Sequence, residues 1–300
     1  MFINALNARD GGEASIEINV NSIIFINLAI RPANVKLGIE IETFMLLEKW
    51  YLDAVFPDGT VWFGYHAQLQ LMRGLRIPWA AGSEFAAGCR EHKITCWKSL
   101  AAPRLENGQW QWNGPDGFGG RWKPAGHAIE SALGSDERFR VNWNCVAPRA
   151  TVTRNQGDEV TSQGTGYVEH LRLESSRPAL PFRNLWWGRA HAGNASLVWI
   201  RWKEGRELCL LFEDGVKVDG QLETLFDGGV RIHTAQGCWE TGKGRPLCDR
   251  DVRRSFPRWL VWLTGKMAPA RELKLAGPVQ FRTHATEFTG TGIWEEVRWT

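Results

Sequence analysis

The chain has 300 residues and a net charge of +3, with basic residues scattered along its length. This length suits one large all-β domain or two ordinary domains, and the weak, dispersed charge argues against nucleic acid as a partner. The six cysteines show no C-x-x-C spacing and no paired clusters. That spacing argues against a zinc site and against a compact disulfide framework. We therefore expect no metal.

Tryptophan is the compositional outlier, with 17 copies against 3 tyrosines. Its side chain combines a large apolar area with one hydrogen-bond donor, so a tryptophan-rich chain lines wide cavities or stacks on flat ligands. The alternative is that tryptophans simply fill the interiors of large β-barrels. Both interpretations stay open at this point.

The start of the chain carries no signal-peptide pattern of basic and then apolar residues. The apolar run from Ile23 to Ile30 is far shorter than a membrane helix requires. We therefore expect a reduced, cytoplasmic protein. Peripheral contact with a membrane, through exposed apolar loops, stays open.

The first half of the chain shows a two-residue period. Residues 1–14 are expected to be an unstructured lead-in, whereas alternating apolar residues from Ile16 to Ile41 predict a long hairpin or two bent strands. Strands at 50–56 and 61–65 flank a Pro-Asp-Gly turn, in which Pro pre-sets φ and Gly supplies a positive φ. Further strands are expected at 69–80, 92–99, 109–113, 119–123 and 138–146. The best short helix candidate is 127–133.

The second half continues the same rhythm. Residues 196–202 and 207–212 predict a hairpin, and the Asp-Gly steps that follow predict turns. The last strands are expected near 256–263, 278–283 and 293–299. Many short strands without helices between them predict an all-β protein of closed or nearly closed antiparallel barrels.

A boundary near residue 180, at Arg177-Pro-Ala-Leu-Pro181, divides the chain into two parts. The predicted domains are residues 15–180 and residues 181–300, and each is large enough for one β-barrel or sandwich. The two parts share no obvious sequence repeat.

Two segments gather most of the chemically capable side chains, namely Gly164–His170 and Leu185–His191. On a strand, Tyr167, Glu169 and Leu171 share one face, and His170 lies on the other. A carboxylic acid between a phenol and a leucine is an unusual choice for a simple core. The alternatives are that Glu169 points to solvent or that it pairs with Arg189 in the second segment.

The pattern Gly164-x-Gly166-Tyr167-x-Glu169-His170, followed by Trp187-Gly188-Arg189 and Val198-Trp199-Ile200, resembles the lipocalin-like family that includes carotenoid 1,2-hydratases (hydroxyneurosporene synthases). It is also similar to the wider tocopherol-cyclase-like and Diels–Alderase-like group, whose members act on long apolar molecules between two β-barrel halves. The family has Asp at position 169 and Asn at position 171, where this chain has Glu and Leu. The resemblance covers the segment from Gly164 to Ile200 and implies two lipocalin-like domains.

The resemblance implies a cofactor-independent hydratase, cyclase or isomerase that acts on an isoprenoid or polyene-like secondary metabolite. Protonation of an alkene needs an acid that stays neutral, and a glutamic acid such as Glu169 in a Trp-lined pocket has its pKa raised by desolvation. The phenol of Tyr167 and a base, either His170 or His191, would complete the catalytic group. If Arg189 pairs with Glu169 instead, the acid stays ionised.

Aromatic faces would stabilise the carbocation that protonation creates. We expect the substrate-binding residues to be Tyr65, His66, Trp186, Trp187, His191 and Trp199. His66 also fits a rim position with no role. Glu295 and Glu296 place one carboxylate on each face of the last strand.

Two other functions stay open. A cavity without a titratable group would favour a carrier of a hydrophobic ligand, and exposed coplanar tryptophans would favour a carbohydrate-binding protein. A cavity that holds Glu169 would favour the enzyme.

Overall fold

The computed structural model describes residues 45–71, 74–86, 91–135, 138–156, 159–176, 180, 182–226, 228–255, 258, 261 and 270–299. Residues Glu42–Thr300 form one compact unit, which contains every element named below. The strands expected between Ile16 and Ile41 lie outside the described residues, as does most of the strand expected at 256–263. The two described residues of that last segment, Arg258 and Val261, are helical, so the prediction of a strand is wrong there.

Within these described ranges, twenty strands form two antiparallel sheets of ten strands each. The first sheet contains β1 (Met45–Val55), β2 (Val61–Leu71), β3 (Leu75–Phe85), β4 (His92–Cys96), β5 (Arg104–Glu106), β6 (Gln109–Asn113), β7 (Gly119–Pro124), β8 (Ile129–Ser135), β9 (Phe139–Gln156) and β10 (Glu159–Ser175). The second contains β11 (Asn184–Ala192), β12 (Ala195–Lys203), β13 (Leu208–Glu213), β14 (Val216–Val218), β15 (Gly220–Thr224), β16 (Val230–Thr234), β17 (Cys238–Thr241), β18 (Arg245–Arg250), β19 (Arg271–Arg282) and β20 (Glu287–Arg298).

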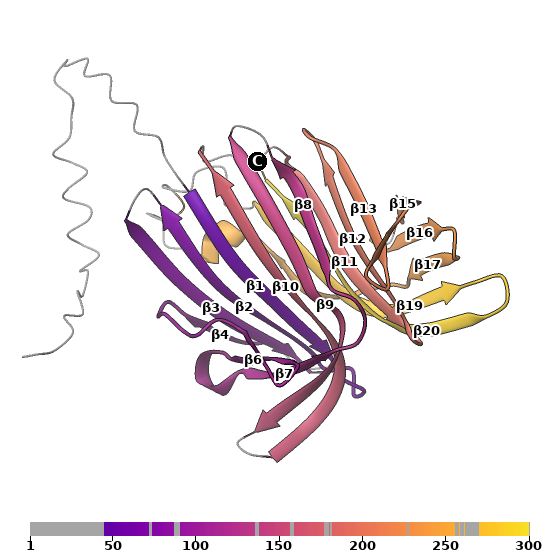
Figure 1. The fold of residues 1–300 in the computed structure, drawn as a ribbon, viewed down its shortest axis with the longest axis horizontal. Helices are drawn as coiled ribbons and strands as arrows, with labels where there is room; N and C mark the ends of the chain where they lie inside the picture. The colour runs from indigo at the N-terminus through magenta and orange to yellow at the C-terminus, as the bar shows by residue number, and fades with distance from the viewer. Residues whose placement is uncertain are drawn as a thin grey trace, which may run out of the picture. The chain divides into compact units, whose positions relative to one another are not determined.

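The two sheets have the same strand order. The first runs β4-β3-β2-β1-β10-β9-β7-β6-β5 with β8 paired to β9, and the second repeats this order with every strand number raised by ten. Figure 1 shows the first sheet from indigo to magenta and the second from pink to yellow. The structure therefore contains a topological repeat that was not predicted from the sequence.

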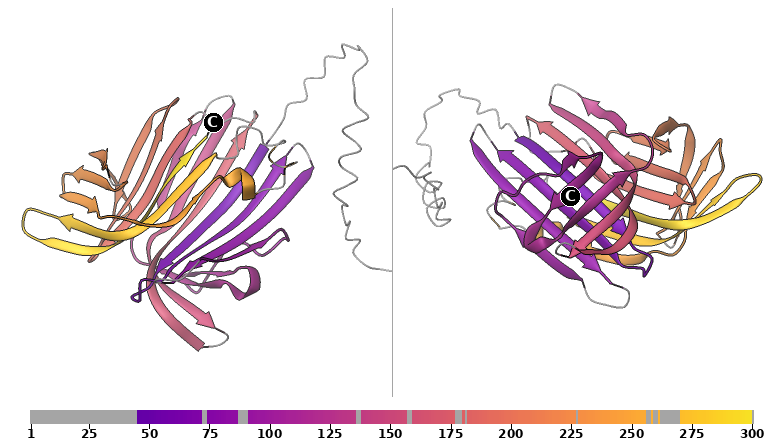
Figure 2. Two further views of the ribbon diagram at one scale, coloured as in Figure 1. Left: turned by 180° about the vertical axis from the view of Figure 1, so that it is seen from behind. Right: turned by 60° about the horizontal axis from the view of Figure 1, so that its bottom comes forward.

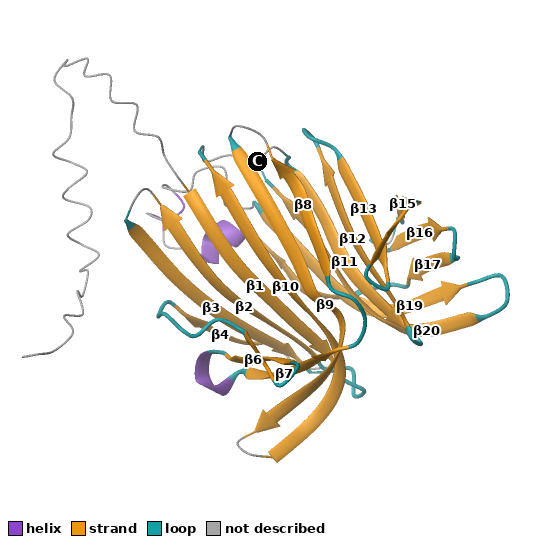
Figure 3. Ribbon diagram, in the orientation of Figure 1, coloured by secondary structure: helices purple, strands orange, loops and turns teal. Residues whose placement is uncertain are grey.

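Strands dominate the described chain, and both sheets curl (Figures 1 and 3). The prediction of an all-β protein with two lipocalin-like barrel or sandwich domains is therefore confirmed. Two short 3₁₀ turns, η1 (Pro115–Gly117) and η2 (Val252–Ser255), add one turn each. No helix among the described residues is both long enough and apolar enough to cross a membrane. The predicted domain limits of 15–180 and 181–300 stay predictions.

Local turn chemistry was predicted well, and one element was not. Gly59 has a φ of 80° in the β1–β2 turn, and the Asp58 side chain accepts a hydrogen bond from the backbone N–H of Thr60. The helix expected at 127–133 is wrong, because this segment leads into β8, which pairs with β9. Ile129 and Leu133 are buried on one face of that strand, so pairing overrides the helical preference of its alanines and leucine.

Each sheet buries both of its faces. Trp112 and Trp122 belong to the core on one side of the first sheet, and Trp199 and Trp239 belong to a core of the second sheet. A third core takes residues from the other faces of both sheets, including Tyr51, Tyr167 and Trp187. The rear view in Figure 2 shows β19 and β20 running along the second sheet. The third core surrounds the cavity described below.

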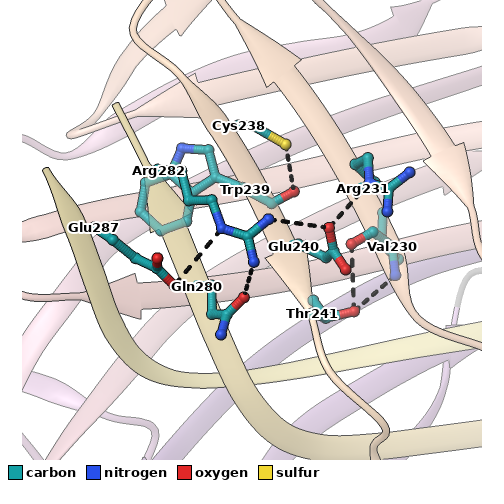
Figure 4. A network of polar contacts seen from close by, with 9 residues as sticks. All are labelled: Val230, Arg231, Cys238, Trp239, Glu240, Thr241, Gln280, Arg282 and Glu287. Atoms are coloured by element: carbon teal, nitrogen blue, oxygen red, sulfur yellow. Dashed lines mark hydrogen bonds and ion pairs between the residues drawn. The ribbon is translucent and has the colours of Figure 1, made fainter. Parts of the chain in front are cut away.

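One end of the second sheet carries a network of polar contacts (Figure 4), in which the paired charged side chains are between 27% and 49% exposed. Arg231 on β16 pairs with Glu240 on β17 at 3.0 Å, and Arg282 on β19 lies 3.9 Å from the same carboxylate. Arg282 also lies 3.6 Å from Glu287 on β20. These contacts tie four strands together at the surface, where ion pairs contribute little to stability.

Candidate active site

A cavity of about 570 Å³ lies between the facing sides of the two sheets. Apolar side chains from both sheets make up most of its lining, including Leu47, Leu69, Ile77, Leu173, Leu185, Ile200, Trp202 and Val297. Its volume is typical of a site for a small organic molecule. The side chains that reach it belong to the two-residue period of each strand, as the sequence pattern predicts for one face.

Glu169 is the carboxylic acid of the first sheet that lines this cavity, and its exposed fraction is 9%. Its Oε2 accepts two hydrogen bonds, one from Nε1 of Trp143 on β9 and one from the hydroxyl of Tyr167, both at 2.6 Å. Among the described residues, its Oε1 accepts no hydrogen bond. One oxygen of the carboxyl group is thus held in place, and the other remains for a ligand.

Burial raises the pKa of the Glu169 carboxyl above its ordinary value, against the opposing charge of Lys49 and the hydrogen bonds from Trp143 and Tyr167. Burial also raises the pKa of the Tyr167 phenol well above its ordinary value, so the phenol keeps its proton and donates a hydrogen bond to Glu169. The site therefore favours a neutral acid held by neutral donors.

The second sheet faces this acid with an ion pair. Lys274 on β19 is buried and pairs with Glu295 on β20, which lines the cavity. The Lys274 ammonium also lies 4.6 Å from the ring centre of Tyr51 and 5.6 Å from that of Trp187. Burial disfavours its charge, but Glu295 and the neighbouring phenols outweigh that cost and raise the pKa of Lys274 well above its ordinary value. Lys274 is therefore a fixed cation.

Four further charged residues line the cavity. Arg250 on β18 pairs with Glu272 on β19 at 3.0 Å. Lys49 on β1 lies 5.0 Å above the ring centre of Tyr65. Lys93 on β4 lines the same side of the cavity as Arg250. Within the part of the chain that the structure describes, no group of three His, Cys, Asp or Glu side chains is arranged to hold a metal.

Arg189 pairs with Asp53 and not with Glu169. Its guanidinium donates from Nε to Oδ1 at 3.1 Å and from Nη2 to Oδ1 at 2.5 Å, and both side chains are fully buried. Its Nη1 donates to Nδ1 of His191 at 3.3 Å, and Nε2 of His191 donates to the carbonyl of Pro148 at 2.8 Å. This network joins β11 to β1 and β9, so it ties the two sheets together.

The structure brings some of the predicted site residues together. Glu169, Trp187 and Tyr65 line the cavity, and Tyr167 touches it through Glu169. The Trp187 ring lies 5.2 Å from the Tyr167 ring in an edge-to-face arrangement. The two-residue period predicts Tyr167, Glu169 and Leu171 on one strand face. In agreement with this, Glu169 and Leu171 line the cavity and Tyr167 is hydrogen-bonded to Glu169.

The other predicted residues do not line this cavity. His170 faces away from it and packs on Trp50 at 4.5 Å, and burial lowers the pKa of its imidazole. Nε2 of His66 lies 3.0 Å from the carbonyl of Leu100 on the other face of β2. Trp199 belongs to the core on the far side of the second sheet, and Trp186 packs against that core.

His191 also lies outside the lining. Burial, followed by the charge of Arg189, lowers the pKa of its imidazole well below the ordinary value. The ring is therefore neutral, with the proton on the nitrogen that faces the Pro148 carbonyl.

Sequence reasoning missed most of the charged residues of the site. No motif pointed to the charged residues Lys49, Asp53, Glu272 and Lys274, nor to Trp143, the neutral hydrogen-bond donor to Glu169. A signal existed for one of them, since Lys274 interrupts the apolar residues at 273, 275 and 276 of a buried strand. Glu295 and Glu296 were expected on opposite faces, and they do separate: Glu295 lines the cavity, whereas Glu296 accepts a hydrogen bond from Arg298 at 2.7 Å.

No protein-family model and no curated protein matches this chain. Among solved structures, kievitone hydratase from Nectria haematococca matches with a TM-score of 0.52 and 9% identity, over 83% of this chain and 88% of that one. A provisionally assigned AttH from Nitrosomonas europaea matches with a TM-score of 0.48 and 14% identity, over 85% and 93%. CghA with Sch210972 matches with a TM-score of 0.47 and 12% identity, over 85% and 88%. The match to kievitone hydratase confirms the predicted resemblance at the level of the fold.

Proposed function

We propose that this protein is a cofactor-independent enzyme that hydrates, cyclises or isomerises a long apolar small molecule by acid–base chemistry, with Glu169 as the acid. One observation carries the proposal. Glu169 lines a largely apolar cavity with Oε2 fixed by two donors and with Oε1 uncommitted among the described residues. Most buried carboxyl groups have their oxygens satisfied. Glu213 also has an oxygen without a partner, but it does not line the cavity, so the combination of a free oxygen and the cavity distinguishes Glu169.

The geometry supports a simple proton transfer. The proton passes from Oε1 of Glu169 to an alkene carbon, and the π bond that breaks leaves a carbocation on the neighbouring carbon. The carboxylate that forms keeps the hydrogen bonds from Trp143 and Tyr167 on Oε2, and the charge of Lys49 stabilises it further. These donors are aimed at charge that appears only as the proton leaves, which favours the transition state over the ground state.

The cation then has three outcomes within the same cavity. Water adds in a hydratase and loses a proton, an internal nucleophile adds in a cyclase, or a neighbouring carbon loses a proton in an isomerase. The faces of Trp187, Trp143 and Tyr65 border the cavity and are suited to stabilise a cation. The Glu169 carboxylate takes up the proton that is lost and thereby returns to its starting state.

The remaining predicted catalytic residues have other tasks in this proposal. Arg189 is engaged by Asp53, and His170 lies on the opposite face of β10, so neither receives a proton-transfer step. The name of kievitone hydratase records hydration by a protein of the same fold, and the fold by itself does not determine an activity. The proposal therefore rests on the environment of Glu169.

A carrier of hydrophobic ligands is the alternative, since the apolar lining would serve it equally well. A carrier gains nothing from a buried acid, because burying an ionisable group without an ionic partner costs free energy. The presence of Glu169 in the cavity thus favours the enzyme. Carbohydrate binding is less well supported: Trp97, with an exposed fraction of 39%, is the one exposed tryptophan among the described residues, so no exposed pair of described tryptophans offers a sugar platform.

The test uses turnover in deuterium oxide. The wild-type protein, Glu169→Gln and Glu174→Gln are incubated with a panel of polyenes and prenylated phenols, and the products are analysed by mass spectrometry. Glu174 lies on the same strand as Glu169 but on its opposite face, so it serves as the matched control. We expect a carbon-bound deuterium in the product, an unchanged melting temperature, and a rate reduced by about 10²–10⁴-fold in Glu169→Gln alone.

Two results would reject the acid role: full activity of Glu169→Gln, or product that contains no carbon-bound deuterium. Tight binding of a panel member by the wild-type protein without any conversion across the panel would favour the carrier.

A further inference from the structure

The charged residues of the cavity gather on one side of it. Along the strand order, Lys93 lies on β4, Arg250 on β18 and Glu272 on β19, with Lys49 on β1 further in. The opposite side, made by β8, β9 and β12, contributes Leu133, Val141, Ile200 and Trp202. Glu169 on β10 lies between the two sides, because β10 pairs with β1 on one edge and with β9 on the other.

The ion pairs on the charged side leave a surplus of positive charge. Arg250 is engaged by Glu272 at 3.0 Å, and Lys274 is engaged by Glu295. Lys49 and Lys93 form no ion pair with any residue that the structure describes. Glu169 accepts its hydrogen bonds from neutral groups. Both lysines therefore face the cavity without a carboxylate in direct contact, although the charge of Glu272 acts on both of them from further away.

We propose that the cavity binds an amphipathic substrate with an anionic head group of the carboxylate class, with the head between Lys49 and Lys93 and the apolar chain between β9 and β12. The inference rests on the proposed function for the position of the reacting bond, which would lie over Glu169 where the polar and apolar sides meet. A neutral hydrocarbon would cover the half-buried ammonium group of Lys49 without supplying a counter-ion, and a cationic head would meet like charges.

The charge balance around Lys93 supports an anion. Partial burial, and then the charge of Arg250, lowers the pKa of the Lys93 ammonium. A bound carboxylate would offset both effects, because it supplies the opposite charge to Lys93 and neutralises the excess beside Arg250. Thr95, which also lines this side, offers a hydroxyl donor to the same head group.

An anionic head would also serve the acid. A negative charge near Glu169 disfavours ionisation of its carboxyl group and offsets the charge of Lys49, which acts to lower that pKa. Substrate binding would then increase the fraction of Glu169 that carries a proton. The same contact would thus select the substrate and prepare the acid.

The experiment compares three probes of equal chain length: dodecanoate, dodecanol and dodecyltrimethylammonium. Binding to the full chain is followed by calorimetry and by tryptophan fluorescence, at a pH where the fatty acid is ionised. We expect dodecanoate to bind about tenfold more tightly than dodecanol, since one charge-assisted contact is of that order. Dodecyltrimethylammonium should bind least tightly.

Variants assign the preference to the two lysines. Lys49→Met and Lys93→Met should each weaken dodecanoate binding about tenfold and leave dodecanol binding unchanged. Lys49→Arg should retain the preference, and Lys123→Met on β7, an exposed lysine outside the cavity, is the matched control. Melting temperatures, measured in parallel, identify a variant that loses affinity because it unfolds. If the methionine variants unfold, the test is whether Lys49→Arg retains the preference for dodecanoate over dodecanol.

Equal affinity of the wild-type protein for all three probes would overturn the inference. An equal loss of affinity for all three probes in the lysine variants would also overturn it. The outcome is separate from that of the turnover experiment. If Glu169→Gln remains active while the carboxylate preference persists, the acid role fails and the head-group inference stands. If the carboxylate preference is absent while Glu169→Gln is inactive, the head-group inference fails and the acid role stands.

Discussion

The two sheets share one strand order, and by that order Glu169 and Glu295 occupy equivalent positions. Glu169 on β10 is opposite Tyr51 on β1, and Glu295 on β20 is opposite Trp187 on β11. Both carboxylates line the same cavity from opposite sheets. The repeat in topology thus presents one acid from each half of the chain.

Their partners differ. Glu169 accepts hydrogen bonds from an indole and a phenol, both neutral, whereas Glu295 pairs with the ammonium group of Lys274. Trp143 stands beside the first acid on β9, and Lys274 stands beside the second on β19, the strand equivalent to β9. The neighbouring strand therefore determines which carboxyl group can hold a proton and which one serves as a counter-ion.

A similar contrast applies two residues further along β1 and β11, where Asp53 and Arg189 stand at equivalent positions by the same register. They pair with each other across the sheets. Burial raises the pKa of the Asp53 carboxyl, and the Arg189 guanidinium opposes that shift. Both oxygens of Asp53 accept from Arg189, so a buried carboxyl group is a candidate acid only where an oxygen remains uncommitted.

The largest effect on the unfolding free energy is expected from removing Lys274, the ionic partner of Glu295. Lys274→Met leaves the Glu295 carboxylate in the core without its ionic partner, and such a change costs about 3–5 kcal/mol of unfolding free energy. Denaturant unfolding measures the loss. The double variant Lys274→Met with Glu295→Gln should recover a large part of it, because no uncompensated charge remains.

The surface network in Figure 4 supplies the control for that variant. Glu240→Gln removes the carboxylate shared by Arg231 and Arg282 but should cost at most about 1 kcal/mol, since solvent screens these pairs. A loss in Lys274→Met no greater than in Glu240→Gln would show that the buried pair contributes nothing special.

The sequence predicts the elements of this comparison better than their contacts. Two-residue periodicity is enough to place Tyr167 and Glu169 on one face, because side chains alternate along any strand. It cannot choose the partner of Arg189, since Asp53 lies 136 positions away and the pairing depends on how two sheets face each other. The expected alternative, a pair between Arg189 and Glu169, satisfied the same local pattern and is not formed.

Sequence periodicity was also insufficient to predict which tryptophans line the cavity and to predict the topological repeat. Trp187 on β11 and Trp199 on β12 lie on paired strands, one register position apart. Their side chains therefore point to opposite faces of the sheet, and of these two only Trp187 lines the cavity.

The equivalent strands β10 and β20 do share the pattern Gly-Thr-Gly-x-x-Glu, at Gly164–Glu169 and Gly290–Glu295, but this short match was not recognised as a repeat. Other equivalent strands carry different side chains, such as Trp143 on β9 and Lys274 on β19. Strand order depends on which edges pair, and periodicity does not report it.

An effect of intermediate size is expected from pH, because burial raises the pKa of Glu169 in the folded protein. Between its ordinary value of 4.5 and the folded value, the native state binds more protons than the unfolded state. The unfolding free energy should therefore fall as pH rises across this window, by at most about 1.4 kcal/mol per pH unit, and stay level above it.

Glu169→Gln isolates this contribution, because Asp53 also titrates with a raised pKa and affects both proteins alike. The difference in unfolding free energy between wild type and Glu169→Gln should decrease as pH rises from the ordinary glutamate pKa. A difference that increases with pH would mean that the folded state favours the charged form, as at an ion pair.

The smallest effect tests the neutral donors that distinguish Glu169 from Glu295. Tyr167→Phe removes one of the two hydrogen bonds to Oε2 and should cost about 0.5–1.5 kcal/mol of unfolding free energy. Because that hydrogen bond acts to lower the pKa of Glu169, its loss should move the pKa further upward. The pH above which an acid-catalysed rate declines should therefore shift to higher values in the variant, as measured by pH–rate profiles on a substrate found with the deuterium assay. Tyr65→Phe is the matched control, since Tyr65 lines the same cavity and is not a hydrogen-bond partner of Glu169. A downward shift in Tyr167→Phe, or an equal shift in both variants, would mean that the phenol does not set the protonation of the acid.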